Sequence, residues 1–166
     1  MLIGSCLIAR LNLLAPYQHL TNHPVVKNYH TFAEQVGMKQ YSQIVKTKLE
    51  KLLTTPFIAI GESVGATALW CNTPNLNPQH CLGAFCLYGS RIRDYLTIKP
   101  ACYSQLVFSQ DESYFLTKQV NHQLSSKPTV FVSTVDLQHG FASPGHHQFN
   151  PQAFAEVIKT IKALKY

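Results

Sequence analysis

The strongest structural signal in this 166-residue chain is the segment IAIGESVGA at residues 58–66. It fits the pattern Gly-x-Ser-x-Gly, with an apolar run before the first glycine and a helix-like segment after the second. In that context the pattern predicts a tight strand-to-helix turn that lifts the hydroxyl of Ser63 above a sheet. We expect a strained backbone at Ser63 and no room for a side chain at Gly61 or Gly65. A glycine-flanked serine that merely caps a helix is the alternative interpretation.

The rest of the sequence alternates between apolar, strand-like runs and amphipathic, helix-like ones. The predicted strands are Leu11–Ala15, Phe57–Ile60, Cys81–Tyr88, Tyr103–Ser109 and Thr129–Thr134. The predicted helices are Tyr29–Leu53, broken near Gly37, then Val64–Cys71, Ser113–Leu124 and Pro151–Leu164. The apolar run at Phe57–Ile60 is typical of a strand covered on both faces. This alternation predicts one α/β domain over residues 1–166, with a mostly parallel sheet and helices on both faces.

Charge and hydropathy narrow the possible partners. The formal charge is +6, but the basic residues are mostly scattered lysines that no aromatic side chains interleave. We therefore expect no nucleic-acid partner. No apolar run approaches the roughly 18 residues that a membrane span needs, so we expect no membrane partner either.

The cysteines and histidines indicate the cellular compartment and whether the chain has a metal site. The five cysteines are odd in number and form no Cys-x-x-Cys pair, which favours reduced core residues in a cytoplasmic protein. His146 and His147 adjoin one another, but no Cys or carboxylate lies nearby at the spacing of metal ligands. We therefore expect no metal site.

Two further residues have the types and positions that an activated serine needs. A serine nucleophile requires a base, and the base requires a carboxylate to orient it. Asp111 follows the predicted strand at 103–109, and His139 follows the last predicted strand. Both therefore lie beyond the carboxyl ends of strands, where ligands bind in open α/β sheets. Glu112 is the nearest competitor for the carboxylate and Asp136 a weaker one.

Each of these residues also has an ordinary structural interpretation. Asp111 could instead cap the helix that follows it. His139 could be a loop histidine without a role in chemistry. The amide of Val64, at the start of the predicted helix, would point toward a developing oxyanion if the turn forms as expected.

A family resemblance rests on four elements of the sequence. They are Gly61–Ala66, the pair Tyr88-Gly89, Asp111, and His139-Gly140-Phe141. Together they resemble the dienelactone hydrolase family of the α/β-hydrolase superfamily, and the similarity runs from about Leu11 to Leu164. The resemblance implies a three-layer α/β-hydrolase fold that acts on esters or lactones without a cofactor.

The same resemblance assigns roles to individual residues. Ser63 would be the nucleophile, Asp111 the acid and His139 the base. The Val64 amide would lie in the oxyanion hole, and Tyr88 would line the substrate pocket. Founding members of the family use a cysteine nucleophile, whereas the serine found here suits ordinary ester hydrolysis.

The N-terminus departs from the family pattern. Family members have further strands before the one that corresponds to Leu11–Ala15, and here only ten residues precede Leu11. We therefore expect the fold to lack its first strands, together with the loop that supplies a second oxyanion donor. An open sheet edge would follow, and with it a homodimer formed through that edge. The alternatives are a longer gene product, a rearranged fold, or a partner chain that fills the gap.

We therefore expect a serine hydrolase that cleaves a small carboxylic ester or lactone through an acyl-enzyme intermediate. Arg91 and Arg93 would hold a substrate carboxylate, unless they are simply a solvated loop pair. Glu62 is expected to support the site or to face solvent rather than to act as an acid. The alternative function is a catalytically silent relative that keeps the turn for packing and binds a partner.

Overall fold

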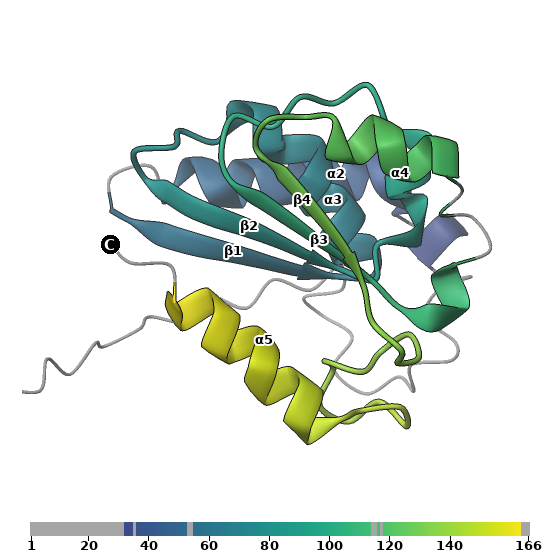
Figure 1. Ribbon diagram of the computed structural model, residues 1–166. Coiled ribbons are helices and arrows are strands. Elements are labelled where there is room, and N and C mark those ends of the chain that lie inside the picture. Colours follow the sequence, from purple (N-terminus) through teal and green to yellow (C-terminus); the bar gives the residue numbers. More distant parts are fainter. Residues whose placement is uncertain (1–31, 35, 53–54, 114–115, 117, 164–166) are drawn as a thin grey trace, which may run out of the picture.

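The computed structural model describes residues 32–34, 36–52, 55–113, 116 and 118–163 (Figure 1). These residues form an α/β structure around a four-stranded sheet with the strand order β1-β2-β3-β4. The strands are β1 (Phe57–Glu62), β2 (Cys81–Leu87), β3 (Ser104–Phe108) and β4 (Val130–Thr134). Every neighbouring pair is parallel. The predicted α/β class and the parallel sheet are therefore confirmed.

The main helices lie in two layers, one on each face of the sheet. They are α2 (Gly37–Glu50), α3 (Val64–Asn72), α4 (Lys118–Ser125) and α5 (Pro151–Ala163). Figure 1 shows α2, α3 and α4 on one face and α5 on the other. Successive strands are added in one direction, so right-handed connections place α3 and α4 on the same face. None of the described helices is long and apolar enough to cross a membrane.

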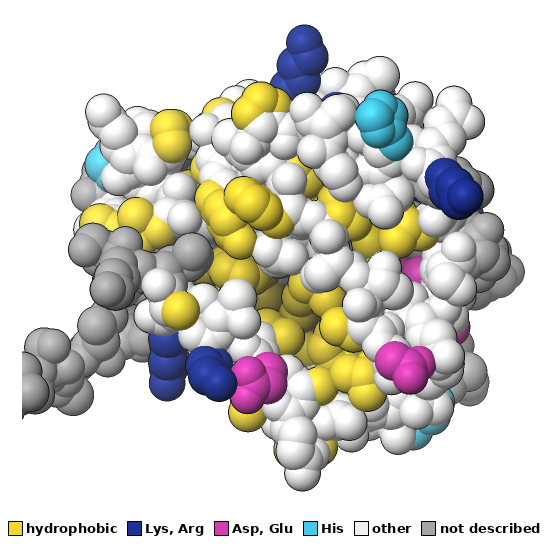
Figure 2. Space-filling view, viewed as in Figure 1, with side chains coloured by type: hydrophobic (Ala, Val, Ile, Leu, Met, Phe, Trp, Pro, Cys, Tyr) yellow, Lys and Arg dark blue, Asp and Glu magenta, His cyan; other side chains and the backbone are white. Residues whose placement is uncertain are grey.

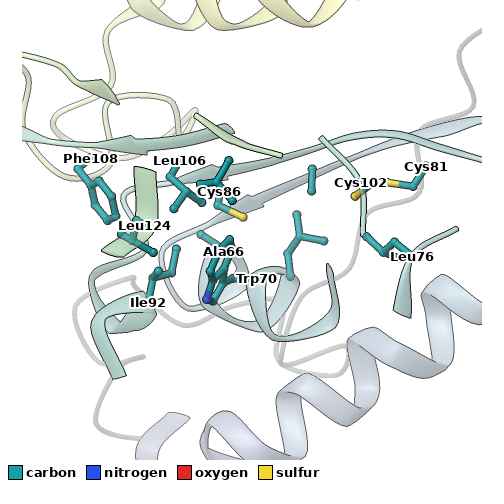
Figure 3. Close-up of a cluster of buried hydrophobic side chains, with 13 residues drawn as sticks. Ala66, Trp70, Leu76, Cys81, Cys86, Ile92, Cys102, Leu106, Phe108 and Leu124 are labelled. Carbon is teal, nitrogen blue, oxygen red and sulfur yellow. The ribbon is translucent and has the colours of Figure 1, made fainter. Parts of the chain in front are cut away.

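The main core lies between the sheet and α3. Cys86 of β2 and Leu106 of β3 point toward α3, where Trp70 is fully buried (Figure 3). Ala84 of β2 belongs to the same buried cluster. The indole nitrogen of Trp70 donates a hydrogen bond to the carbonyl of Tyr95 at 3.0 Å, so its one polar atom is satisfied. This packing fixes α3, and therefore the turn that precedes it, against the sheet.

The opposite face of the sheet is only partly covered. Phe154 and Val157 of α5 pack with Leu87 and Val107 near the carboxyl ends of the strands. Nearer to the amino ends of the strands, Ile60 is 48% exposed and Phe131 is 51% exposed. Figure 2 shows apolar side chains gathered in a hollow between the sheet and α5. The prediction that strand 57–60 is covered on both faces is therefore wrong at Ile60, because α5 leaves that part of the sheet open.

Most predicted elements occur close to their expected bounds. The break in the first helical region is confirmed at Gly37, whose φ of 68° lies in the left-handed region. The predicted helix 113–124 is wrong at its start: residues Gln110–Glu112 form a 3₁₀ turn, and α4 begins only at Lys118. The turn forms because the Glu112 side chain folds back to accept a hydrogen bond from the amide of Ser109. The predicted strand Leu11–Ala15 lies outside the described residues.

Candidate active site

The predicted strand-to-helix turn is present between β1 and α3. Ser63 has φ 52° and ψ −118°, a conformation that is strained for a residue with a side chain. Its amide donates a hydrogen bond to the carbonyl of Leu87 at 3.0 Å, and its carbonyl accepts one from the amide of Thr67 at 3.2 Å. The turn is therefore fastened both to the neighbouring strand and to the first turn of α3.

The two glycines of the motif have different roles. A Cβ at Gly61 would lie 2.5 Å from the carbonyl oxygen of Gly65, closer than atoms can approach, so no larger residue fits there. Among the described residues, a Cβ at Gly65 would meet the hydroxyl of Tyr41 at the ordinary contact distance of 3.6 Å. The steric expectation is therefore confirmed for Gly61 and wrong for Gly65.

The carboxyl end of each strand contributes one part of a side-chain cluster. Ser63 follows β1, Tyr88 follows β2, Glu112 lies just beyond β3 and His139 lies beyond β4. The parallel register brings these ends to one edge of the sheet. There the Nε2 atom of His139 lies 3.1 Å from the Oγ atom of Ser63.

The second ring nitrogen of His139 faces a glutamate. Its Nδ1 atom lies 3.5 Å from Oε1 of Glu112, whose side chain is buried. The other oxygen of this carboxylate accepts the amide hydrogen bond from Ser109, whereas Oε1 has no hydrogen-bond partner of good geometry among the described residues. A buried carboxylate oxygen is costly unless it is paired, so the arrangement favours a proton on Nδ1. Nε2 is then free to accept the proton of Ser63.

Asp111 takes a different place from the one predicted. Its side chain is exposed and accepts a hydrogen bond from the main-chain amide of His139 at 3.0 Å. It therefore anchors the histidine's backbone, while Glu112 faces the ring. The 3₁₀ turn decides which of the two neighbouring carboxylates points inward. The capping-box spacing of Ser109 and Glu112 was the sequence signal that could have indicated this.

Val64 is the first residue of α3, a position where amide groups lack acceptors within the helix. The helix dipole adds positive potential at the same place. An oxyanion on a carbon attacked by Ser63 would meet this end of the helix. Val64 thus begins α3 as predicted, and the role of its amide toward an oxyanion stays a prediction.

Tyr88 lies against the imidazole. It is 1% exposed, and its ring centroid is 4.7 Å from that of His139 and 5.3 Å from that of Phe141. Its φ of 42° makes it, like Ser63, a strained residue at the end of a strand. Burial, followed by the negative charge of Glu62, raises the pKa of Tyr88 far above its ordinary value. Tyr88 therefore supports the ring as a neutral phenol.

The two predicted arginines already have a partner. Arg91 and Arg93 lie in a 3₁₀ turn at Ser90–Asp94, where the carboxylate of Asp94 is 2.9 Å from Nε of Arg91 and 3.9 Å from Nε of Arg93. These pairs lie at the surface. Their proposed role toward a substrate carboxylate stays a prediction.

The loop that carries His139 depends on one further glycine. Gly140 has φ 91°, and a Cβ there would run into the imidazole of His146.

Among the described residues, the histidines near the site show no sign of a metal centre. Burial, then the neighbouring His147 and His139, lower the pKa of His146. Within the part of the chain that the structure describes, no group of three or more His, Cys, Asp or Glu side chains is placed to hold a metal ion.

Sequence reasoning missed one contact of this site. The hydroxyl of Ser143 donates a hydrogen bond to Oε2 of Glu62 at 2.6 Å. The sequence offered a reason to consider Glu62, because it is a charged residue directly before the candidate nucleophile. Nothing in the sequence pattern pointed to Ser143 as its partner.

The fold and this cluster define an α/β protein whose parallel sheet carries a Ser–His–carboxylate set at its carboxyl edge. No family model matches the chain. The chain is 31% identical over 155 residues to a protein of Bacillus subtilis (strain 168) named "Uncharacterized protein YczH". The match covers 91% of this chain and 74% of the Bacillus protein. The chain therefore belongs to the same family as YczH, a protein whose name assigns no activity.

Proposed function

We propose that the chain is a serine hydrolase of the α/β-hydrolase fold, related to the dienelactone hydrolases. It would cleave a small carboxylic ester or lactone without a cofactor. One observation carries the proposal: the 3.1 Å contact between Ser63 Oγ and His139 Nε2, at a strained turn between a strand and a helix. A serine that only capped a helix would need neither the histidine nor a carboxylate behind it.

The reaction follows from the positions of these groups. His139 Nε2 removes the proton of Ser63 as Oγ attacks the carbonyl carbon of the ester. The oxyanion that forms accepts a hydrogen bond from the amide of Val64. The intermediate collapses when His139 donates its proton to the leaving alkoxide, and an acyl group remains on Ser63. His139 then deprotonates a water molecule, which attacks the acyl group. As the bond to Ser63 Oγ breaks, His139 returns this proton to Oγ, and the carboxylic acid is released.

In this scheme Glu112 replaces Asp111 as the orienting acid. The imidazolium formed in each step is stabilised by the buried carboxylate of Glu112 at Nδ1. Asp111 holds the main chain of His139 and so acts on its position. The assignment keeps the order Ser, acid, His of this fold.

Labelling with a fluorophosphonate tests the proposal, since only an activated serine reacts with it quickly. We expect rapid labelling of the wild-type protein, no labelling of Ser63→Ala, and normal labelling of Ser126→Ala, which removes an exposed hydroxyl of another loop. The same three proteins are assayed with a panel of nitrophenyl esters. Equal turnover by wild type and Ser63→Ala would exclude Ser63 from the mechanism.

A second candidate function is binding without catalysis. The exposed Ile60 and Phe131 on the open face of the sheet favour it, because large apolar side chains on one face are typical of contact surfaces. A folded protein that does not label, and that captures a partner through this face, would support the binding function instead.

A further inference from the structure

A single hydrogen bond joins the two halves of the candidate site. Glu62 is the last residue of β1 and directly precedes Ser63, and Ser143 lies in the loop that carries His139. The two residues are 81 positions apart in the chain, yet Ser143 Oγ donates to Glu62 Oε2 at 2.6 Å. The contact is short and charge-assisted, which places it among the stronger hydrogen bonds in proteins.

The loop that carries His139 is also hydrogen-bonded to the protein at its other end. The amide of His139 donates to Asp111 at 3.0 Å, and two turns within the loop are closed by main-chain bonds, Phe141 to Gln138 and Ser143 to Gly140. The loop is thus held to the β3 side through Asp111 and to the β1 side through Glu62. His139 lies between these two attachments.

A buried tyrosine packs against the histidine of this loop. Burial, the charge of Glu62 and the hydroxyl of Ser143 all influence the Tyr88 phenol, so its oxygen lies beside this pair. The ring of Tyr88 packs on His139 on one side and on the buried Phe141 on the other. A movement of Ser143 away from Glu62 would therefore be passed to the imidazole through Tyr88 and Phe141.

The turn itself does not require a glutamate at this position. Gly61 is fixed by a steric clash and Ser63 by its hydroxyl, whereas the residue between them is free in the Gly-x-Ser-x-Gly pattern. The Glu62 side chain is partly buried and meets a partner from a distant loop. Its identity is explained by that partner rather than by the local backbone.

We infer that Glu62 and Ser143 are positioning residues, whose hydrogen bond keeps His139 Nε2 within reach of the Ser63 hydroxyl. The inference rests on the proposed hydrolase function. Loops move on nanosecond to microsecond timescales, so a loop-borne base needs such attachments. A displacement of about 1 Å at a reacting pair costs up to about 10²-fold in rate.

The kinetic test compares Glu62→Ala, Ser143→Ala and the double variant with wild type on a nitrophenyl ester. We expect kcat to fall by about 10- to 100-fold in each single variant, with KM unchanged, because a positioning pair acts on the base and not on the bound substrate. The double variant should be no slower than the worse single variant, since both changes break one interaction. Ser143→Thr, which keeps a hydroxyl, should restore most of the rate.

Matched controls are Glu156→Ala and Ser126→Ala, whose side chains bond only at exposed positions. Both should retain wild-type kcat. Should Glu62→Ala fail to fold, Glu62→Gln replaces it, because the amide oxygen still accepts from Ser143 and the variant should stay active. Single variants with wild-type kcat, or effects confined to KM, would overturn the inference.

Hydrogen exchange separates this inference from the proposed function. The amides of residues 139–143 should exchange faster in Glu62→Ala and in Ser143→Ala than in wild type and controls. This readout does not require an active enzyme. Unchanged exchange would overturn the positioning role even in an active hydrolase. Faster exchange in the variants of a protein whose wild type does not label would support the attachment of the loop and contradict the hydrolase function.

Discussion

Two neighbouring carboxylates contact different parts of His139. Glu112 is buried and faces the ring at 3.5 Å, whereas Asp111 is exposed and holds the main-chain amide at 3.0 Å. A carboxylate that stabilises an imidazolium must be charged, while one that only accepts a hydrogen bond can be replaced by an amide oxygen. The two residues should therefore respond differently to the same chemical change.

We predict that Glu112→Gln lowers kcat on nitrophenyl esters by about 10²- to 10⁴-fold, because the amide cannot stabilise the imidazolium at Nδ1. Asp111→Asn should cost about tenfold or less, since its Oδ1 still accepts from His139. Steady-state kinetics on the matched pair measure both effects. The reverse order of the two losses would return the acid role to Asp111.

Two of the residues that meet at the site could be predicted from residue types and strand ends, but the remaining contacts between its side chains could not. Ser63 and His139 were placed at strand ends by the alternation of elements, and the structure brings them together. The choice between Asp111 and Glu112 depended on a 3₁₀ turn where the sequence indicated a helix start. The Ser143 contact bridges 81 positions, and no periodic pattern encodes such a distance.

At the scale of the elements, the two glycines of the turn between β1 and α3 differ in how much space surrounds them. Gly61 is surrounded by backbone of α3, so an added methyl group meets atoms that cannot move without shifting the helix. Gly65 already lies within α3, where a methyl group is accepted. The motif thus contains one steric requirement and one tolerated position.

We predict opposite effects for alanine at the two positions. Gly61→Ala should destabilise the protein by about 1–3 kcal/mol through overpacking, and should abolish labelling of Ser63 by distorting the turn. Gly65→Ala should raise the free energy of unfolding by about 0.5–1 kcal/mol, since alanine favours a helix over glycine. Urea denaturation measures both changes. A destabilised Gly65→Ala variant would show that the position is tighter than the 3.6 Å contact indicates.

The strands were predicted well because their apolar runs are dictated by burial in the sheet. The bounds of β2, β3 and β4 differ from the predicted ones only at the ends. The exception is the coverage of β1, where the apolar sequence suggested two covered faces and Ile60 is 48% exposed. Hydrophobicity shows that a side chain favours burial, and it does not show whether another element covers it.

At the scale of the whole molecule, the open face and edge of the sheet bear on association. Within the described sheet β1 is an edge strand, and it contains neither lysine nor proline, the residues that usually protect edges. Ile60, Phe85, Gln105 and Phe131 are register partners across the four strands, so the exposed pair lies at the two ends of one row. A second copy pairing with β1 would cover Ile60.

We predict a homodimer formed through β1, with light scattering giving twice the chain mass at micromolar concentration. Ile60→Lys should yield a monomer, because pairing would bury an unpaired charge beside the edge. Phe131→Lys is the matched control: it places the same charge at the β4 end of the row and should leave the dimer intact. A monomeric wild type would refute the dimer, and a monomer caused by Phe131→Lys alone would move the contact to β4.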